Sequence, residues 1–171
     1  IKREDIARAW SASAKGENCV AHVNEDSVTM AIEAAQNAVA HAGIGAAAID
    51  AIYLGTESAP NIEQSAVGFI GATLGTRPDI DTADFGASPR ASIAALKACL
   101  DAIAAGRISA GLVIGADCRP APPGSDLEIN FGAAAMALIV GKVDGVAQIE
   151  AIHTYSTEFR DSWRSTKDAY V

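Results

Sequence analysis

Hydrophobic positions along the chain switch between helical spacing and short continuous runs, which predicts helices and buried strands in alternation. After Asp26 or Ser27, either of which can cap a helix, apolar side chains recur at three- and four-residue spacing until Gly43 ends the pattern. Gly75 and Gly106 end two further helical patterns in the same way. These two helices are predicted at residues 62–74 and 92–105, and a further short helix is predicted at residues 1–10.

Short apolar runs between these helices predict the strands of a sheet. Because strands and helices alternate and the last strands follow one another directly, we expect an α/β fold with a mixed, mainly parallel sheet. Active groups in such sheets gather at the carboxyl ends of the strands, where Glu57, Ser88 and Asp117 stand. The predicted strands cover residues 51–54, 80–85, 111–115, 133–140 and 146–155.

The composition fits one domain with a core of small side chains. The 171 residues are 50% hydrophobic but only 5% aromatic, so Ala, Val, Ile and Leu must fill the core. The net charge of −8 argues against nucleic acid as the main partner, because phosphate binding needs clustered Lys and Arg. No apolar run is long enough to span a bilayer, so we expect a soluble protein with no membrane partner.

The three cysteines, Cys19, Cys99 and Cys118, lie far apart in the chain and form no C-x-x-C pair. Neither a zinc site nor a disulfide framework is therefore indicated. The three histidines also show no ligand spacing. We expect no metal or cofactor, and a reducing cytoplasmic location.

Four stretches of the chain, in this order, resemble the hydroxymethylglutaryl-CoA synthase branch of the thiolase superfamily, in particular its archaeal and bacterial members. They are residues 26–35, the sequence Leu-Gly-Thr-Glu-Ser at 54–58, the segment 84–99, and 115–164. The resemblance implies a thiolase-like fold, in which a β-α-β-α-β-α-β-β half occurs twice. Residues 1–171 would form a single N-terminal half-domain, and the second half, which carries further catalytic groups in the family, would be absent from this chain.

The resemblance also implies a catalytic role for Glu57. In the family, the glutamate of Gly-Thr-Glu-Ser removes a proton from the acetyl methyl of a bound thioester or returns one. That role requires a carboxyl whose pKa is raised toward neutrality by burial among apolar neighbours. The alternative is a surface glutamate that caps a helix beginning near Asn61.

The family's nucleophilic cysteine has no counterpart in the segment 84–99. One alignment places Ser88 at the nucleophile position and another places Pro89 there, so neither supplies a thiol. A serine is a far weaker nucleophile and needs an adjacent base. Ser88 also fits a structural role as the N-cap of the following helix. Cys99, inside an Ala-rich helix, and Cys118, in an ordinary loop position, are poor substitutes.

Three further residues are candidates for binding substrate or CoA. Arg90 precedes a helix and Arg119 begins the Pro-rich loop 119–125, so both could meet phosphates or a carboxylate. Either could equally be a solvated surface arginine. Ser156, in the last of the four stretches, is the third candidate.

Two classes of function remain open. One is an acyl-CoA enzyme that makes or breaks a carbon–carbon bond, an acyltransferase of the synthase or thiolase type. The other is a non-catalytic subunit that binds acyl-CoA or a partner chain. The resemblance further implies a homodimer or larger assembly, formed through the strand at 80–85 and the helix after it. It also implies a small zinc-ribbon and OB-fold protein as a possible partner.

Overall fold

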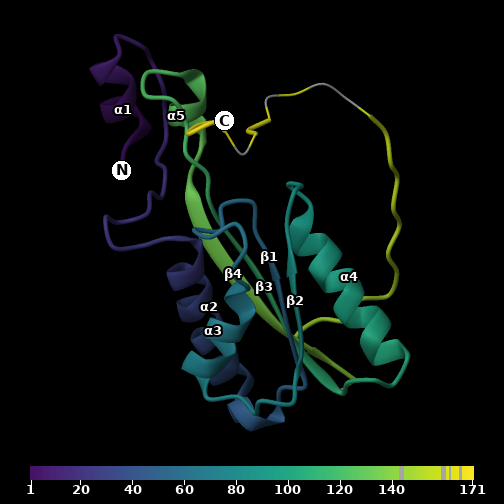
Figure 1. Ribbon diagram of the computed structural model, residues 1–171. Coiled ribbons are helices and arrows are strands. Elements are labelled where there is room, and N and C mark those ends of the chain that lie inside the picture. Colours follow the sequence, from purple (N-terminus) through teal and green to yellow (C-terminus); the bar gives the residue numbers. More distant parts are fainter. Residues whose placement is uncertain (143–144, 159–160, 162, 166) are drawn as a thin grey trace.

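The computed structural model describes residues 1–171 except 143–144, 159–160, 162 and 166. A four-stranded sheet lies at its centre, with helices on both faces (Figure 1). Helices α2 (Ser27–Ala42) and α3 (Ala66–Leu74) cover one face, and α4 (Ala91–Ala104) covers the other. The short helices α1 (Arg3–Ala9) and α5 (Asp126–Asn130) pack against each other beyond one end of the sheet.

The sheet has the strand order β2-β1-β3-β4. Strand β1 (Ala51–Gly55) pairs in parallel with both β2 (Asp81–Phe85) and β3 (Ala110–Cys118). Strand β4 (Ala133–Gly141) runs antiparallel to β3. The predicted α/β class and the mixed, mainly parallel sheet are therefore confirmed. In this arrangement the carboxyl ends of the parallel strands β1, β2 and β3 lie at the same end of the sheet.

Two apolar cores form because successive side chains of a strand point to opposite faces of the sheet. On the α2 and α3 side, the fully buried side chains of β1 and β3 include Ile52, Leu54, Leu112 and Ile114. On the α4 side, Tyr53 and Val113 meet alanines and one cysteine of the helix. Aliphatic and small residues make up most of both cores, as the composition predicts, and Tyr53 is an aromatic exception in the second core.

Helix α4 lies very close to the sheet because glycines line the contact. A Cβ added at Gly55 would lie well within 3.0 Å of the Ser92 backbone, which no real Cβ tolerates. A Cβ at Gly111 would meet the Cys99 sulfur at a similarly forbidden distance, and one at Gly115 would meet the Ser92 hydroxyl. Only glycine at these three positions allows this packing distance.

Helix α2 begins and ends at the residues that its sequence indicates. The Asp26 carboxylate accepts hydrogen bonds from the backbone N–H groups of Val28 (3.0 Å) and Thr29 (2.8 Å). The Thr29 hydroxyl in return accepts from the Asp26 N–H at 2.8 Å, which completes a capping box. Gly43 ends the helix with a left-handed φ of 65°. Of the two predicted caps, Asp26 is the one used.

Helix α3 begins later than predicted, at Ala66 rather than at residue 62. Its first N–H groups, those of Ala66 and Val67, donate to the Asp84 carboxylate at 3.1 and 3.3 Å. This cap comes from the next strand of the sheet, so the local sequence pattern does not reveal it. Asn61, predicted near the helix start, lies in the irregular segment before the helix.

The strand predicted at 146–155 is wrong, because these residues form no regular structure and are almost entirely exposed. The half-fold is accordingly one strand shorter than expected in the described part of the chain. Strand β4 is an edge strand, and the segment leaves it and passes outside α4 (Figure 1). A run of apolar residues forms no strand where no neighbouring strand pairs with its backbone groups. Ser162, in the fourth resembling stretch, lies outside the described residues.

The sequence pattern missed helix α5, a single five-residue turn capped by the Ser125 hydroxyl, which accepts from the Glu128 N–H at 3.3 Å. Helices this short leave almost no periodicity to detect. Among the residues that the structure describes, no helix is both long and apolar enough to cross a bilayer.

Candidate active site

The turn that carries Glu57 follows β1 directly and is tied to the end of β3. Asp117 Oδ1 accepts hydrogen bonds from the Glu57 N–H (2.7 Å) and the Ser58 N–H (3.1 Å). It also accepts from the hydroxyls of Thr56 (3.1 Å) and Ser58 (2.8 Å). The Ser58 hydroxyl oxygen in turn accepts from the Cys118 N–H at 2.9 Å. The backbone of Glu57 is therefore fixed relative to both parallel strands.

The Glu57 side chain is only 14% exposed. Burial raises the pKa of its carboxyl, the Arg119 charge opposes that rise, the Asp117 charge adds to it, and Arg164 opposes it. Its Oε2 is buried and accepts no hydrogen bond from any residue in the described part of the chain. A buried, unsatisfied carboxyl oxygen with a raised pKa has the properties of a general acid or base.

Arg119 is the cation closest to this carboxyl. Its Nε lies 3.4 Å from Glu57 Oε2, close enough for an ion pair but without the geometry of a hydrogen bond. The guanidinium carbon lies 4.9 Å from the centre of the Phe131 ring, a cation–π contact that holds the side chain in place. The sequence left open whether Arg119 lies at the site or is a solvated surface arginine. Its side chain is 24% exposed and pairs with Glu57, so it lies at the site.

The turn between β2 and α4 places Ser88 and Pro89 near Glu57 and Arg119. Ala87, just before them, has a φ of 58°, a left-handed conformation that is rare for any residue but glycine. Helix α4 begins at Ala91 with Arg90 as its N-cap, so Ser88 is not the N-cap that the sequence suggests. Its hydroxyl instead accepts a long hydrogen bond of 3.4 Å from the Arg90 N–H.

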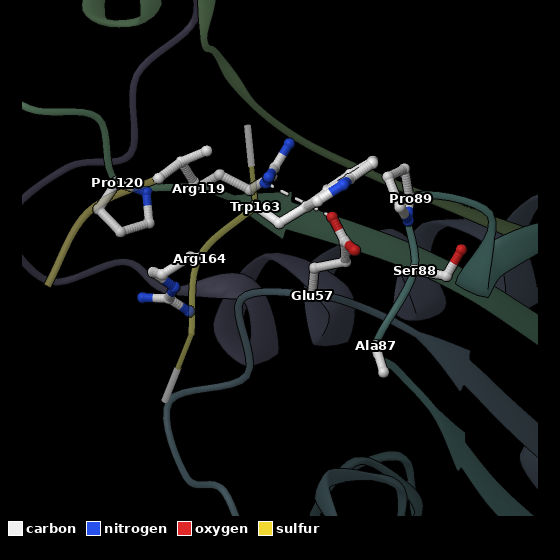
Figure 2. Close-up of a pocket in the computed structure, with 9 residues that line it drawn as sticks. Glu57, Ala87, Ser88, Pro89, Arg119, Pro120, Trp163 and Arg164 are labelled. Carbon is white, nitrogen blue, oxygen red and sulfur yellow. Dashed lines mark ion pairs between the residues drawn. The ribbon is translucent and has the colours of Figure 1, made fainter. Parts of the chain in front are cut away.

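A cleft of about 450 Å³ brings these groups together. In Figure 2 the Glu57 carboxyl lies between the Arg119 guanidinium and the turn at Ser88 and Pro89. The Ser88 hydroxyl points away from that carboxyl in this view. The residues that line the cleft are Glu57, Ala87, Ser88, Pro89, Arg119, Pro120, Trp163, Arg164 and Val171.

Sequence reasoning thus placed Glu57, Ser88 and Arg119 in one site, and it missed Trp163 and Arg164 as parts of that site. The described residues 145–158, which precede them in the chain, have no regular structure, so no periodicity indicates where Trp163 and Arg164 lie. Their occurrence in the fourth resembling stretch was the only available signal. The role of Asp117 as the anchor of the Glu57 turn was also missed, although its position at a strand end was noted.

The other candidate residues lie elsewhere. Arg90 is exposed at the start of α4 and does not line the cleft. Ser156 lies in the exposed segment after β4, also outside the cleft lining. Cys99 is fully buried, and burial raises the pKa of its thiol to about 11, which fits the packing role expected of it. Binding roles for Arg90 and Ser156 stay predictions.

No cysteine is among the residues found to line the cleft. The described residues also contain no group of three His, Cys, Asp or Glu side chains placed to hold a metal ion. That the protein uses no cofactor stays a prediction. The site offers a carboxyl of raised pKa, two arginines and a serine, which suits proton transfer next to an anionic or thioester ligand.

Similar proteins fall into one structural class. MvaS in complex with 3-hydroxy-3-methylglutaryl coenzyme A superposes with a TM-score of 0.77 at 23% identity, covering 83% of this chain and 36% of MvaS. A 3-oxoacyl-(acyl-carrier-protein) synthase III superposes with a TM-score of 0.76 at 18% identity, covering 86% of this chain and 47% of that enzyme. No protein-family model matches the chain. The fold is therefore thiolase-like.

Sequence comparison narrows this class. The hydroxymethylglutaryl-CoA synthase of Methanopyrus kandleri is 36% identical over 99% of this chain, and the match covers 51% of that protein. The enzyme of Pyrococcus furiosus is also 36% identical over 99% of this chain, covering 50% of its own length. By sequence the chain is similar to hydroxymethylglutaryl-CoA synthases. It spans about half the length of these curated relatives.

Proposed function

We propose that the chain is part of an acyl-CoA enzyme that forms or cleaves a carbon–carbon bond, as the names of its relatives suggest. The observation that carries this proposal is Glu57, a buried carboxyl of raised pKa with an unsatisfied oxygen in the cleft. A structural carboxyl would be expected to use its oxygens in hydrogen bonds. Glu57 instead has one carboxyl oxygen, Oε2, that accepts no hydrogen bond in the described part of the chain and lies 3.4 Å from Arg119 Nε.

In this proposal Glu57 transfers a proton at the carbon next to a thioester carbonyl. The ionised carboxyl takes a methyl proton from acetyl-CoA, which leaves an enolate, and the protonated carboxyl later returns a proton to the same carbon. Burial raises the pKa of Glu57 above its ordinary value, which makes the carboxylate a stronger base. Arg119 and Arg164 provide positive charge for the anionic ligand.

Deuterium exchange tests this role without requiring a complete condensation reaction. Acetyl-CoA incubated with the protein in deuterium oxide should gain deuterium in its methyl group, measured by mass spectrometry against a protein-free control. Glu57→Gln should lower the exchange rate by about 10²–10⁴-fold, the usual effect of losing a general base. Glu63→Gln makes the same chemical change at an exposed residue outside the cleft and should leave the rate unchanged.

Acylation of Ser88 by acetyl-CoA is a separate step that can be tested by mass spectrometry. Ser88 Oγ would attack the thioester carbonyl carbon, the carbon–sulfur bond would break, and CoA would leave as a thiol with the proton from the hydroxyl. An acetyl-enzyme would then appear by intact mass, and Ser88→Ala would abolish it. Iodoacetamide should leave the exchange activity intact if no thiolate takes part. An adduct mapped to Cys118 would overturn this account of the turn.

A second function, an acyl-CoA-binding or partner-binding subunit, is favoured by one observation. The turn before α4 presents Ser88 and Pro89 to the cleft instead of a thiol, and the serine hydroxyl faces away from Glu57 (Figure 2). Calorimetric binding of acetyl-CoA without deuterium exchange and without an adduct would identify a binding subunit. We favour the enzyme, since a binding subunit has no need of the unsatisfied Glu57 oxygen.

The remaining parts of the proposal concern assembly and location. The outer edge of β2 is unpaired among the described residues, which suits a homodimer formed through that strand and the following helix. All three cysteines are free, which fits a reducing cytoplasm. A zinc-ribbon and OB-fold partner rests on the family resemblance alone. The chain itself is proposed to form one N-terminal half-domain.

A further inference from the structure

Asp117 is the residue with the densest hydrogen bonding around the cleft. One of its oxygens, Oδ1, accepts all four hydrogen bonds from the turn at residues 56–58, two from backbone N–H groups and two from hydroxyls. Asp117 does not line the cleft itself. It therefore acts on the site only through the turn that it holds.

The geometry points to Asp117 as a positioning residue for Glu57, which fixes the backbone turn from which the Glu57 side chain enters the cleft. This inference rests on the proposed role of Glu57 as the acid or base. Strand β1 ends at Gly55, so the N–H groups of Glu57 and Ser58 have left the ladder between strands. Without Asp117 the Glu57 N–H would lose the acceptor at 2.7 Å, and the Ser58 N–H would keep only the Thr56 hydroxyl oxygen at 3.1 Å.

Asp117 offers two separable properties to Glu57, an acceptor oxygen and a negative charge. Hydrogen bonds from N–H groups to a carboxylate are stronger than those to a neutral oxygen, so the charge tightens the turn. The same charge lies close enough to Glu57 to raise its pKa, acting with burial and against Arg119 and Arg164. An asparagine at position 117 would keep the acceptor oxygen and remove the charge.

A purely structural role is the competing explanation. Asp117 also helps to join β1 to β3, because Ser58 bridges its carboxylate and the Cys118 N–H. In that case only the stability of the fold would depend on Asp117. The proton affinity of Glu57 would then be the same with Asp or Asn at position 117.

NMR titration of the Glu57 side-chain carboxyl separates the two explanations. For Asp117→Asn we expect only small changes in the backbone amide shifts at residues 56–58, because the acceptor oxygen stays, and a lower pKa of Glu57, because the charge is lost. For Asp117→Ala we expect displaced amide shifts in the same residues. If Asp117→Ala does not fold, the asparagine variant alone decides. An unchanged Glu57 titration in Asp117→Asn would overturn the inference.

Asp84→Asn is the matched control. Asp84 lies in the parallel strand β2 and also accepts hydrogen bonds from two backbone N–H groups, those of Ala66 and Val67, but it does not line the cleft. Its replacement should leave the Glu57 titration unchanged. A shift as large as that of Asp117→Asn would show a general charge effect and contradict the positioning role.

Deuterium exchange into acetyl-CoA connects this inference to catalysis. Asp117→Ala should lower the exchange rate by about 10²-fold, the effect of displacing a catalytic group by roughly 1 Å. If Glu57→Gln does not lower exchange, the proposed function fails, whereas the NMR coupling between Asp117 and Glu57 can still hold. If exchange depends on Glu57 but neither Asp117 variant changes the titration or the rate, the positioning role alone is wrong.

Discussion

Glu57 combines burial with an unsatisfied oxygen, and that combination affects stability as well as chemistry. Its pKa in the folded protein lies above the ordinary value of 4.5, first because of burial. Between the unfolded and the folded pKa, the folded protein binds more protons than the unfolded chain does. The contribution of Glu57 to the free energy of unfolding is therefore lost as pH rises through that window, and it stays lost above it.

Glu57→Gln should accordingly be more stable than the wild type at neutral pH and lose this advantage on acidification below the ordinary Glu pKa. The amide is neutral at every pH, so it carries no cost of burying a charge. Urea unfolding of both proteins across this pH range measures the difference. A constant difference in the free energy of unfolding at all pH values would contradict the raised pKa. A variant that gains stability while losing exchange activity would show that the site is maintained for function.

The cysteines should differ sharply in reactivity. Cys19 is exposed and Cys99 is fully buried, with a thiol pKa raised to about 11 by that burial. Only the thiolate reacts with iodoacetamide, so at mildly alkaline pH Cys19 should be alkylated and Cys99 protected until the protein unfolds. Peptide mass mapping before and after adding guanidinium measures this order. Alkylation of Cys99 in the native protein would show that α4 separates from the sheet.

At the level of residues, sequence could identify Glu57 because its neighbours form a recognisable strand end. It could not reveal that Asp117 anchors this residue, since that contact joins positions 60 residues apart. The N-cap role of Ser88 was wrong because capping depends on the backbone angles of the turn, where Ala87 adopts a left-handed conformation.

At the level of elements, the contact between α4 and the sheet leaves the least room for added side-chain atoms. Gly111→Ala should destabilise the protein by about 1–3 kcal/mol, because the new methyl group would overlap the Cys99 sulfur. Cys99→Ala in the same chain removes that sulfur and should restore part of the loss. A double-mutant cycle by urea unfolding measures the coupling between the two positions.

Two other glycines serve as controls for this prediction. Gly68 lies inside α3 with nothing within 4 Å of an added Cβ, so Gly68→Ala should stabilise the protein by about 0.5–1 kcal/mol. Gly55→Ala should destabilise it, and Cys99→Ala should not rescue it, since the methyl group there would meet the α4 backbone. Additive effects of Gly111→Ala and Cys99→Ala would contradict direct contact.

Sequence predicted the elements best where their signals are local. Asp26 and Gly43 delimit α2 because capping and left-handed termination depend on residues within one turn. Helix α3 was placed too early because its cap, Asp84, comes from another strand. The segment 146–155 was predicted as a strand from its apolar residues, but no neighbouring strand pairs with it, and only the tertiary structure decides such a case.

At the level of the whole molecule, β2 leaves one edge of the sheet open in the described part of the chain. If a homodimer forms through this edge, light scattering should give twice the monomer mass at micromolar concentration. Thr82→Lys should shift dissociation to higher protein concentration, because lysine on an edge strand opposes strand pairing. Thr73→Lys, on the exposed side of α3, should have no effect. A clean monomer at all concentrations would contradict the dimer.

The strand order has a consequence for how the protein is made. Strand β1 is central, and its neighbours β2 and β3 are synthesised after it. Until β3 has left the ribosome, Glu57 sits at a sheet edge without Asp117 to bind its N–H and without Arg119 beside its carboxyl. Nascent chains that end before β3 can therefore bury part of the core, but they contain no cleft. The cleft lining also contains Trp163, Arg164 and Val171, which are synthesised after β4, so the cleft is completed later than the sheet that supports it.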